Sequence, residues 1–223
     1  MSRQLFVAGT DTGIGKTHAA QALVHAFRQA GERVVGMKPV ASGSARTPHG
    51  LRNQDALDLQ GASAPVPTYE RVNPIALEEA VSPHLAAAVA GTRIDWAPMD
   101  AAFESLAHEY DRVVVEGVGG WMVPLSESIS AEQLPMRWKL PVVLVVGIRL
   151  GCISHARLTA RAIEADGCRL AGWIANVIEP DMLMREENIE TLRRLIPAPC
   201  LGVLPWRVGP ADAARLIDLA PLA

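Results

Sequence analysis

The sequence contains little cysteine, few aromatic side chains and no excess of positive charge. Its three cysteines, Cys152, Cys168 and Cys200, form no C-x-x-C pair, which argues against a disulfide framework and against a zinc site. Aromatic residues make up 4% of the 223 residues and the five tryptophans are scattered, so a stacking surface for nucleic acid is not expected. The formal net charge of -3 gives no overall attraction for nucleic acid or for an anionic membrane.

Long hydrophobic runs are also missing. The longest, such as residues 141–147, are far too short to cross a bilayer and are typical of buried strands. The amino terminus leads directly into the apolar run Leu5–Ala8, without the pattern of a secretory signal peptide. We therefore expect a cytoplasmic protein that binds neither a membrane nor nucleic acid.

The sequence does contain ample material for a core, since hydrophobic residues account for 49% of it. Short β-branched segments alternate with longer segments of helical periodicity, which is typical of βαβ units. Strands are predicted at residues 4–8, 33–37, 112–116, 142–146, 170–177 and 200–203, and helices at 16–30, 154–166 and 181–195. The pattern predicts a single α/β domain over residues 1–223, with a mostly parallel sheet flanked by helices.

Two segments lack a clear pattern. Residues 41–53 are rich in Gly, Ser and Pro and follow a predicted strand, where ligand-binding loops lie in α/β proteins. Residues 63–80 are also irregular. After them, Ser82 and Pro83 are suited to the N-cap and the first position of a short helix.

The strongest signal is a phosphate-binding loop, Gly9-Thr-Asp-Thr-Gly-Ile-Gly-Lys-Thr17, between a predicted strand and a predicted helix. Its backbone N–H groups and the helix N-terminus are suited to phosphate oxygens. Lys16 is expected to reach the β- and γ-phosphates, and the Thr17 hydroxyl to bind Mg²⁺. Five residues rather than the usual four separate Gly9 from Gly15. An ordinary glycine-rich turn is the weaker interpretation, because the strand, the helix and the Lys-Thr pair accompany the loop.

Two acidic residues are candidates for the same ion. Glu116 ends the hydrophobic segment Arg112–Glu116, the position of a Walker B acid. Acids at strand ends are often surface residues, but the Gly-Val-Gly-Gly that follows allows close approach to a ligand and favours the functional interpretation. Asp55 opens a helix-like stretch, and the pattern fits a metal ligand and a helix N-cap equally well.

A second lysine, Lys38, ends another predicted strand and is followed by Ser42 in a glycine-containing loop. Two lysines near one terminal phosphate suggest stabilisation of charge during attack by a small anionic nucleophile. From these residues alone, a surface lysine before a proline turn remains the alternative.

Several motifs, in order along nearly the whole chain, together resemble dethiobiotin synthetases. They are Gly9–Thr17, Lys38-Pro-Val-Ala-Ser-Gly43, Asn53-Gln-Asp55, Ser82-Pro-His84, Val115-Glu-Gly-Val-Gly-Gly-Trp121, Leu144–Ile153 and Pro205-Trp206. The resemblance implies a P-loop NTPase fold, a homodimer, and conversion of 7,8-diaminononanoate, carbon dioxide and ATP into dethiobiotin, ADP and phosphate. It also implies a route through a carbamate and a carbamic-phosphoric anhydride.

The same resemblance assigns roles to individual residues. It implies that Thr17, Asp55 and Glu116 are Mg²⁺ ligands, that Lys16 and Lys38 hold the γ-phosphate, and that Lys38 is catalytic. The implied nucleotide-binding residues are Gly13, Ile14, Gly15, Lys16, Thr17, His18, Asp55, Glu116, Gly117, Val118, Gly119, Asn176, Val177, Pro205, Trp206 and Arg207. The implied substrate-binding residues are Thr12, Ser42, Gly119, Gly151, Cys152 and Ile153, the last three through backbone N–H groups from a partner subunit.

Within this set, Asn176 is expected to read adenine, because an amide can pair with both N6 and N7. The chain departs from the family pattern at Gly13, where other members often carry a larger side chain. Cys152 is expected to pack rather than react, since the sequence gives it no basic partner. His84 and His155 are expected to be structural.

Two other functions share the phosphate loop. Regulatory ATPases of the partitioning type commonly carry an additional lysine early in the loop, where this chain has Thr10, Asp11 and Thr12. Amidating synthetases of cobalamin synthesis usually add a glutamine-hydrolysing domain, for which 223 residues leave no room. The synthetase of dethiobiotin is the favoured interpretation.

Overall fold

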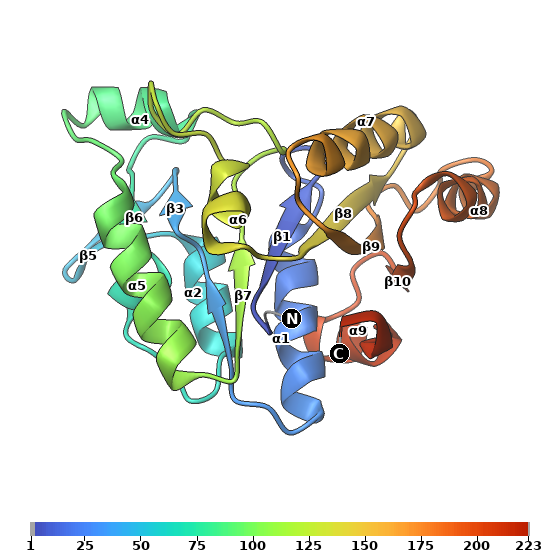
Figure 1. Cartoon of the computed structure of the whole chain (residues 1–223), viewed down its shortest axis with the longest axis horizontal. Coiled ribbons are helices and arrows are strands. Elements are labelled where there is room, and N and C mark those ends of the chain that lie inside the picture. The colour runs from blue at the N-terminus through green and yellow to red at the C-terminus, as the bar shows by residue number, and fades with distance from the viewer. Residues whose placement is uncertain (1–2, 223) are drawn as a thin grey trace.

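The computed structural model describes residues 3–222, and a sheet of six strands runs through its centre (Figure 1). The strand order is β10-β9-β8-β1-β7-β2, and every neighbouring pair is parallel. The strands are β1 (Leu5–Gly9), β2 (Val34–Met37), β7 (Arg112–Glu116), β8 (Val142–Ile148), β9 (Leu170–Val177) and β10 (Cys200–Leu204). The predicted α/β class and parallel sheet are confirmed, and each predicted strand is present with its ends moved by at most two residues.

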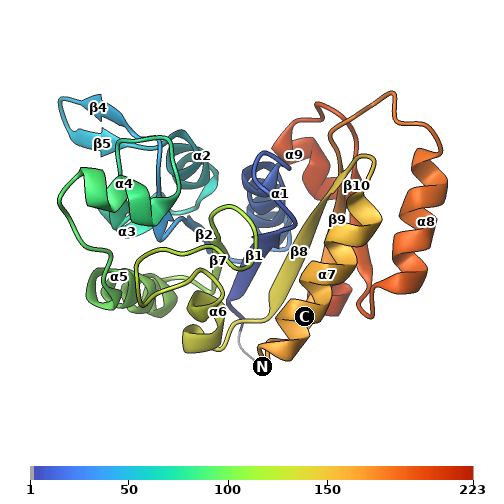
Figure 2. The ribbon, with the colours of Figure 1, turned by 90° about the horizontal axis from the view of Figure 1, so that it is seen from above.

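Both faces of the sheet are covered by helices, and the central strands alternate between two cores. Phe6 and Ala8 of β1 belong to one core, whereas Leu5 and Val7 belong to the other. Figure 2 shows α1 (Lys16–Gln29), α2 (Gln54–Ala62) and α9 (Pro210–Ala213) on one side, and α5 (Trp96–Glu109), α6 (Gln133–Trp138) and α7 (Cys152–Ala165) on the other. Burial on both faces explains why these strands read as continuous hydrophobic runs.

The helices differ from their predictions mainly at their ends. α1 forms as predicted, and Gly31 follows it with a positive φ of 92° that suits a glycine after a helix. α7 begins two residues before the predicted start, at Cys152, and α8 (Arg185–Leu195) begins four residues late. α5 and α6 were not predicted. Pro98 interrupts the pattern of α5 but lies in its first turn, where proline is tolerated.

The two segments without a clear pattern contain short elements. β4 (Ala45–Thr47) and β5 (Gly50–Arg52) form an antiparallel hairpin, and β3 (Val40–Ala41) pairs in parallel with β6 (Ile75–Ala76). The short helix α3 (Tyr69–Val72) precedes β6, and α4 (Pro83–Val89) follows the second of these segments. Ser82 and Pro83 occupy the predicted positions at the start of α4, although the Ser82 side chain makes no capping hydrogen bond.

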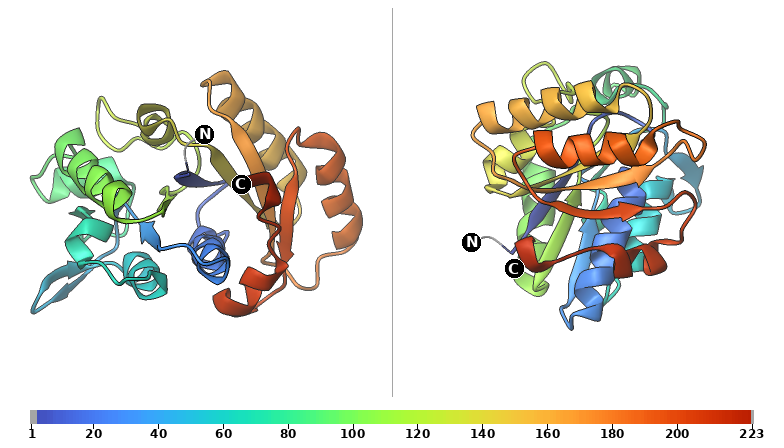
Figure 3. Two further views of the ribbon diagram at one scale, coloured as in Figure 1. Left: turned by 60° about the horizontal axis from the view of Figure 1, so that its bottom comes forward. Right: turned by 90° about the vertical axis from the view of Figure 1, so that its right-hand side faces the viewer.

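The chain ends with two short 3-10 helices, η1 (Ala214–Leu216) and η2 (Ala220–Leu222), after α9, which packs beside α1 (Figure 3). Across residues 3–222, no helix combines the length and the apolar character needed to cross a membrane. The loops after β1, β2 and β7 all leave the carboxyl edge of the sheet, where ligands bind in open α/β folds.

Candidate active site

The loop between β1 and α1 curves at two glycines. Gly13 and Gly15 have φ values of 73° and 83°, a region that glycine adopts at no steric cost. A Cβ at Gly15 would lie 2.1 Å from Asn176 Nδ2, so glycine also leaves room for that side chain. Asn176 donates from Nδ2 to the Ile14 carbonyl at 2.8 Å. The phosphate loop is therefore held directly against the end of β9.

Lys16 lies buried within this loop. Its Nζ donates to the Asp11 carbonyl at 2.7 Å. Burial and the nearby charge of Lys38 lower the pKa of Lys16 to about 8. An anion beside this ammonium offsets the cost of burying it, so the environment of Lys16 is suited to a phosphate group.

Asp11 ties the phosphate loop to the end of β8. Its Oδ1 accepts the Thr12 N–H at 2.7 Å, and its Oδ2 accepts Arg149 Nη2 at 2.6 Å. Both side chains of this ion pair are partly exposed, so we assign the pair a positioning role rather than a large stabilising one. Among the three positions where an additional lysine would be expected in a regulatory ATPase, residues 10–12, this chain therefore has a paired carboxylate at Asp11.

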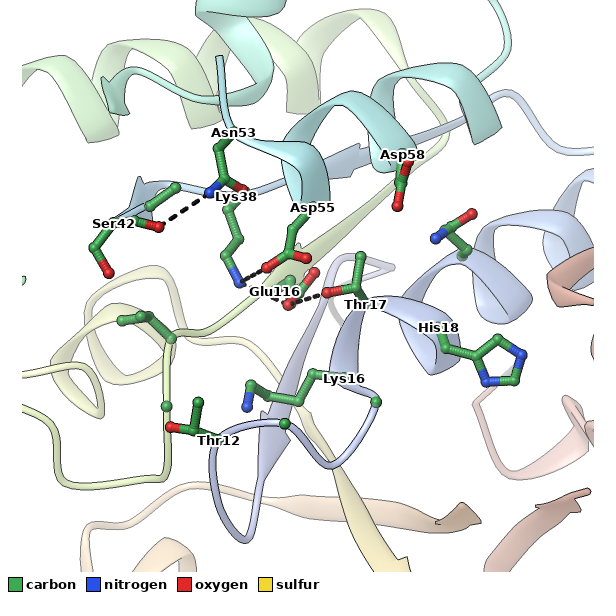
Figure 4. A pocket seen from close by; sticks show the side chains of 16 residues that line it. Thr12, Lys16, Thr17, His18, Lys38, Ser42, Asn53, Asp55, Asp58 and Glu116 are labelled. Atoms are coloured by element: carbon green, nitrogen blue, oxygen red, sulfur yellow. Dashed lines mark hydrogen bonds and ion pairs between the residues drawn. The ribbon is translucent and has the colours of Figure 1, made fainter. Parts of the chain in front are cut away.

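Four side chains meet beside the loop, from α1, α2, β7 and the residue that follows β2 (Figure 4). Lys38 Nζ lies 2.6 Å from Glu116 Oε1 and 3.4 Å from Asp55 Oδ2. Thr17 donates from its hydroxyl to the same Glu116 Oε1 at 2.9 Å. Lys38 also donates to the Gly117 carbonyl at 3.0 Å. Lys38, for which a surface position was the alternative interpretation from the sequence, is therefore buried among the candidate metal ligands.

The same residues fit a magnesium ion that binds together with phosphates. Glu116 Oε2 is buried and accepts no hydrogen bond from any residue in the described range 3–222. Mg²⁺ is usually held by one or two carboxylates, with water and phosphate oxygens completing its octahedron. The described residues contain no cluster of three or more His, Cys, Asp or Glu side chains that could hold a metal. A hydroxyl and two carboxylates therefore suit Mg²⁺ carried by a nucleotide.

Asn53 organises the segment that carries Asp55. It is the N-cap of α2, and its side chain accepts the Ala56 N–H at 3.3 Å. The alternative interpretation of Asp55 as the N-cap is therefore wrong, and its carboxylate faces Lys38 from the first turn of α2. Asn53 also donates from Nδ2 to the Ser42 carbonyl at 3.1 Å, which fixes Ser42 at the cavity wall (Figure 4).

Two neighbouring cavities lie along the loop. The first, of about 490 Å³, is lined by Thr12, Gly13, Gly15, Lys16, Thr17, His18, Gln21, Lys38, Ala41, Ser42, Asn53, Asp55, Asp58, Glu116, Val118 and Gly119. The second, of about 250 Å³, is lined by Gly13, Gly15, His18, Asn176, Val177, Ile178, Pro205, Trp206, Arg207 and Val208. The charged cavity has the character of a phosphate site, and the second offers an amide and an indole suited to a flat base.

Some predicted site residues lie outside these cavities. Ile14 and Gly117 contribute backbone carbonyls that accept from Asn176 and Lys38. Gly151 and Ile153 line a separate cavity of about 430 Å³ along α7. Cys152 is buried, and burial raises the pKa of its thiol, which agrees with the prediction that it packs rather than reacts.

The structure adds residues that the sequence argument missed. Asp58 lies three residues after Asp55 in α2, and Gln21 four residues after Thr17 in α1, so helical spacing places each pair on one face. This helical spacing is the sequence signal that could have identified Asp58 and Gln21 as site residues. Ala41, Ile178 and Val208 carry no comparable signal, because their position depends on how distant segments pack.

Comparison with solved structures shows the fold. MinD cell division protein of Aquifex aeolicus matches with a TM-score of 0.57 and 19% identity, over 98% of this chain and 88% of that chain. The septum site-determining protein MinD from Pyrococcus horikoshii OT3, complexed with Mg-ADP, gives a TM-score of 0.52 and 14% identity. The match covers 94% of this chain and 86% of that chain. At these identities the likeness concerns the P-loop NTPase fold alone.

Comparison of sequences is more specific. A family model described as an AAA domain matches residues 3–209. The ATP-dependent dethiobiotin synthetase BioD of Xanthomonas euvesicatoria pv. vesicatoria (strain 85-10) is 56% identical over 209 residues, which is 94% of this chain and 93% of that protein. An identity of this size over almost the full length of both proteins shows that the chain belongs to the dethiobiotin synthetase family.

Proposed function

We propose that this chain closes the ureido ring of dethiobiotin from 7,8-diaminononanoate, carbon dioxide and MgATP, at the site formed by Lys16, Lys38 and the residues around them. As a member of its family, the chain is an ATP-dependent ligase of biotin biosynthesis. The observation that carries the site assignment is the position of Lys38 Nζ between the carboxylates of Glu116 and Asp55, beside the phosphate loop.

The proposed reaction requires no nucleophile from the protein. One substrate amine adds carbon dioxide and loses a proton, which gives a carbamate. A carbamate oxygen attacks the γ-phosphorus and displaces ADP, forming a carbamic-phosphoric anhydride. The second amine attacks the carbonyl carbon and loses a proton, and phosphate leaves with the bridging oxygen as the ring closes. Positioning and electrostatic stabilisation therefore have to supply most of the rate enhancement.

Lys16 and Lys38 are the residues suited to the charge of the transferred phosphoryl group. Both are buried, so a charge interaction with phosphate is weakened less by water than it would be at the surface. Ser42 and Thr12 line the cavity where we propose that the carbamate lies. A Cβ at Gly119 would lie 2.9 Å from Val123 Cγ2, so only glycine fits at this point of the chain without a shift of Val123.

We assign Mg²⁺ to Thr17, Asp55 and Glu116. The buried, unpaired Glu116 Oε2 supports this, as does the Mg-ADP bound by the MinD of Pyrococcus horikoshii, which shares the fold. When bound, Mg²⁺ supplies positive charge to the β- and γ-phosphate oxygens.

The second cavity is the proposed adenine site. Asn176 uses Nδ2 to hold the Ile14 carbonyl, so its Oδ1 remains to accept from the base. Trp206 is 44% exposed at the cavity wall, and its indole offers a flat surface for stacking. Pro205 and Arg207 flank it.

We also propose a homodimer whose interface includes residues 147–155. Leu150 is 87% exposed and Leu158 is 64% exposed, close to the turn at Gly151 that begins α7. Exposed apolar side chains of this size favour an interface. Backbone N–H groups at the start of a 14-residue helix suit a carboxylate, here that of the substrate bound to the partner subunit.

Labelled bicarbonate tests the order of these steps. When the oxygens of the bicarbonate are labelled with ¹⁸O, the proposed route transfers one labelled oxygen from carbon dioxide to the released phosphate. Mass spectrometry of that phosphate is the measurement. Unlabelled phosphate, with dethiobiotin still forming, would exclude attack of the carbamate on ATP.

A further inference from the structure

His18 lies where the two cavities meet. Gly13, Gly15 and His18 are common to both linings, and His18 is the one of the three with a polar side chain. A nucleotide with its phosphates in the first cavity and its base in the second has its sugar at this junction. Figure 4 shows His18 on the far side of Thr17 from Lys38, away from the reacting groups.

One ring nitrogen of His18 is already engaged. Nε2 lies 2.8 Å from the Val208 carbonyl oxygen. Since a carbonyl oxygen can only accept, Nε2 carries the hydrogen of this bond. Val208 follows Pro205–Arg207 and lines the base cavity with them. His18 therefore holds the segment that forms one wall of the base cavity.

The other ring nitrogen is left to a ligand. Within residues 3–222, no hydrogen bond to Nδ1 of His18 is formed. With the hydrogen on Nε2, Nδ1 of the neutral ring is an acceptor. An acceptor repels phosphate oxygens but suits a hydroxyl. Phosphates have donors elsewhere, in the loop N–H groups and Lys16.

We propose that His18 determines sugar specificity, with Nδ1 accepting a hydrogen bond from a ribose hydroxyl of ATP while Nε2 holds the 205–208 segment. This inference rests on the proposed use of ATP at this site. A deoxynucleotide leaves Nδ1 unpaired at the junction, so the enzyme discriminates against it. One net hydrogen bond corresponds to about a threefold to tenfold difference in affinity.

Two substitutions separate the two nitrogens. His18→Gln places an amide near the position of Nε2 and removes the acceptor at Nδ1. His18→Asn does the reverse. Dissociation constants for ATP, 2′-deoxy-ATP and 3′-deoxy-ATP, measured by calorimetry with Mg²⁺, give a discrimination ratio for each variant. We expect about a threefold to tenfold ratio for one deoxynucleotide in the wild type, a similar ratio in His18→Asn, and about one in His18→Gln.

His108→Gln is the matched control, because it makes the same substitution at an exposed position of α5 that lines neither cavity. It should keep the wild-type ratio. A wild-type ratio of about one, or an unchanged ratio in His18→Gln, would overturn the inference. Thermal melting of each variant shows whether it is folded. If the wild type binds ATP and makes dethiobiotin while the ratio fails, only this inference is wrong, whereas the absence of both activities contradicts the proposed function itself.

Discussion

Lys38 and Glu116 form a buried ion pair, with Nζ 2.6 Å from Oε1 and side-chain exposures of 5% and 1%. Each charge compensates the other away from water, where an unpaired charge is costly. The Thr17 hydroxyl donates to the same carboxylate oxygen. A phosphate and a cation entering this site provide new partners of the right sign for both members. The pair therefore holds two side chains of opposite charge in a buried position at the carboxyl edge of the sheet.

Lys38→Gln should separate binding from chemistry. Lys16 and the loop N–H groups still hold the phosphates, so ATP affinity should remain within several-fold of the wild type. Ring closure should fall about a hundredfold to a thousandfold, the usual effect of losing one preorganised donor to a developing charge. Single-turnover assays with calorimetry measure both quantities. Lys139→Gln, at an exposed position, is the control. Near-normal ring closure in Lys38→Gln would refute the catalytic role.

The two carboxylates should differ in their effect on stability. Asp55 is 45% exposed on its side chain, so Asp55→Asn should change the free energy of unfolding by no more than about 1 kcal/mol. Glu116→Gln removes one partner of a buried pair and should cost up to about 3–5 kcal/mol. Both substitutions should impair the turnover that depends on Mg²⁺, because each removes an anionic ligand of the ion. Denaturant unfolding and magnesium titrations measure these effects. A wild-type magnesium response in either variant would exclude that residue as a ligand.

The glycines of the phosphate loop offer a matched pair. Gly13 and Gly15 both have positive φ, so an alanine at either position costs about 1–2 kcal/mol of backbone strain. A Cβ at Gly13 meets nothing within 4 Å, whereas one at Gly15 would lie 2.1 Å from Asn176 Nδ2. Gly13→Ala should therefore retain ATP binding, and Gly15→Ala should lose most of it. Equal affinities in the two variants would show that the contact with Asn176 is unimportant.

Leu150→Asp should weaken the proposed dimer. A charge on this exposed side chain would have to be desolvated in an apolar interface. Light scattering should show dissociation at concentrations where the wild type is dimeric, and turnover should fall with it if the partner completes the site. Val89→Asp, at a side chain 71% exposed on α4, is the control. A fully active monomer would contradict the shared site.

Much of the fold follows from local patterns in the sequence. The six strands are recognisable because burial on both faces makes them continuously apolar, and α1 follows from its periodicity. The hairpin of β4 and β5 and the helices α5 and α6 were missed. They are short, polar or interrupted by proline, and they depend on packing against other segments.

The site was predictable where a motif fixes the backbone, and less so where distant segments meet. The loop at Gly9–Thr17 and the acid at Glu116 are visible in the sequence. The burial of Lys38 and its pairing with Glu116, 78 residues away in the chain, could not be obtained from spacing. The contact between His18 and Val208 spans 190 residues and has no sequence signal at all.

The most direct test is product formation by the purified protein. It is incubated with 7,8-diaminononanoate, ¹³C-labelled bicarbonate and MgATP, and dethiobiotin and ADP are quantified by mass spectrometry. We expect dethiobiotin carrying one ¹³C atom, with one ADP released for each ring closed and little ADP when the diamine is omitted. Folded, ATP-binding protein that releases ADP but forms no labelled dethiobiotin would contradict the account.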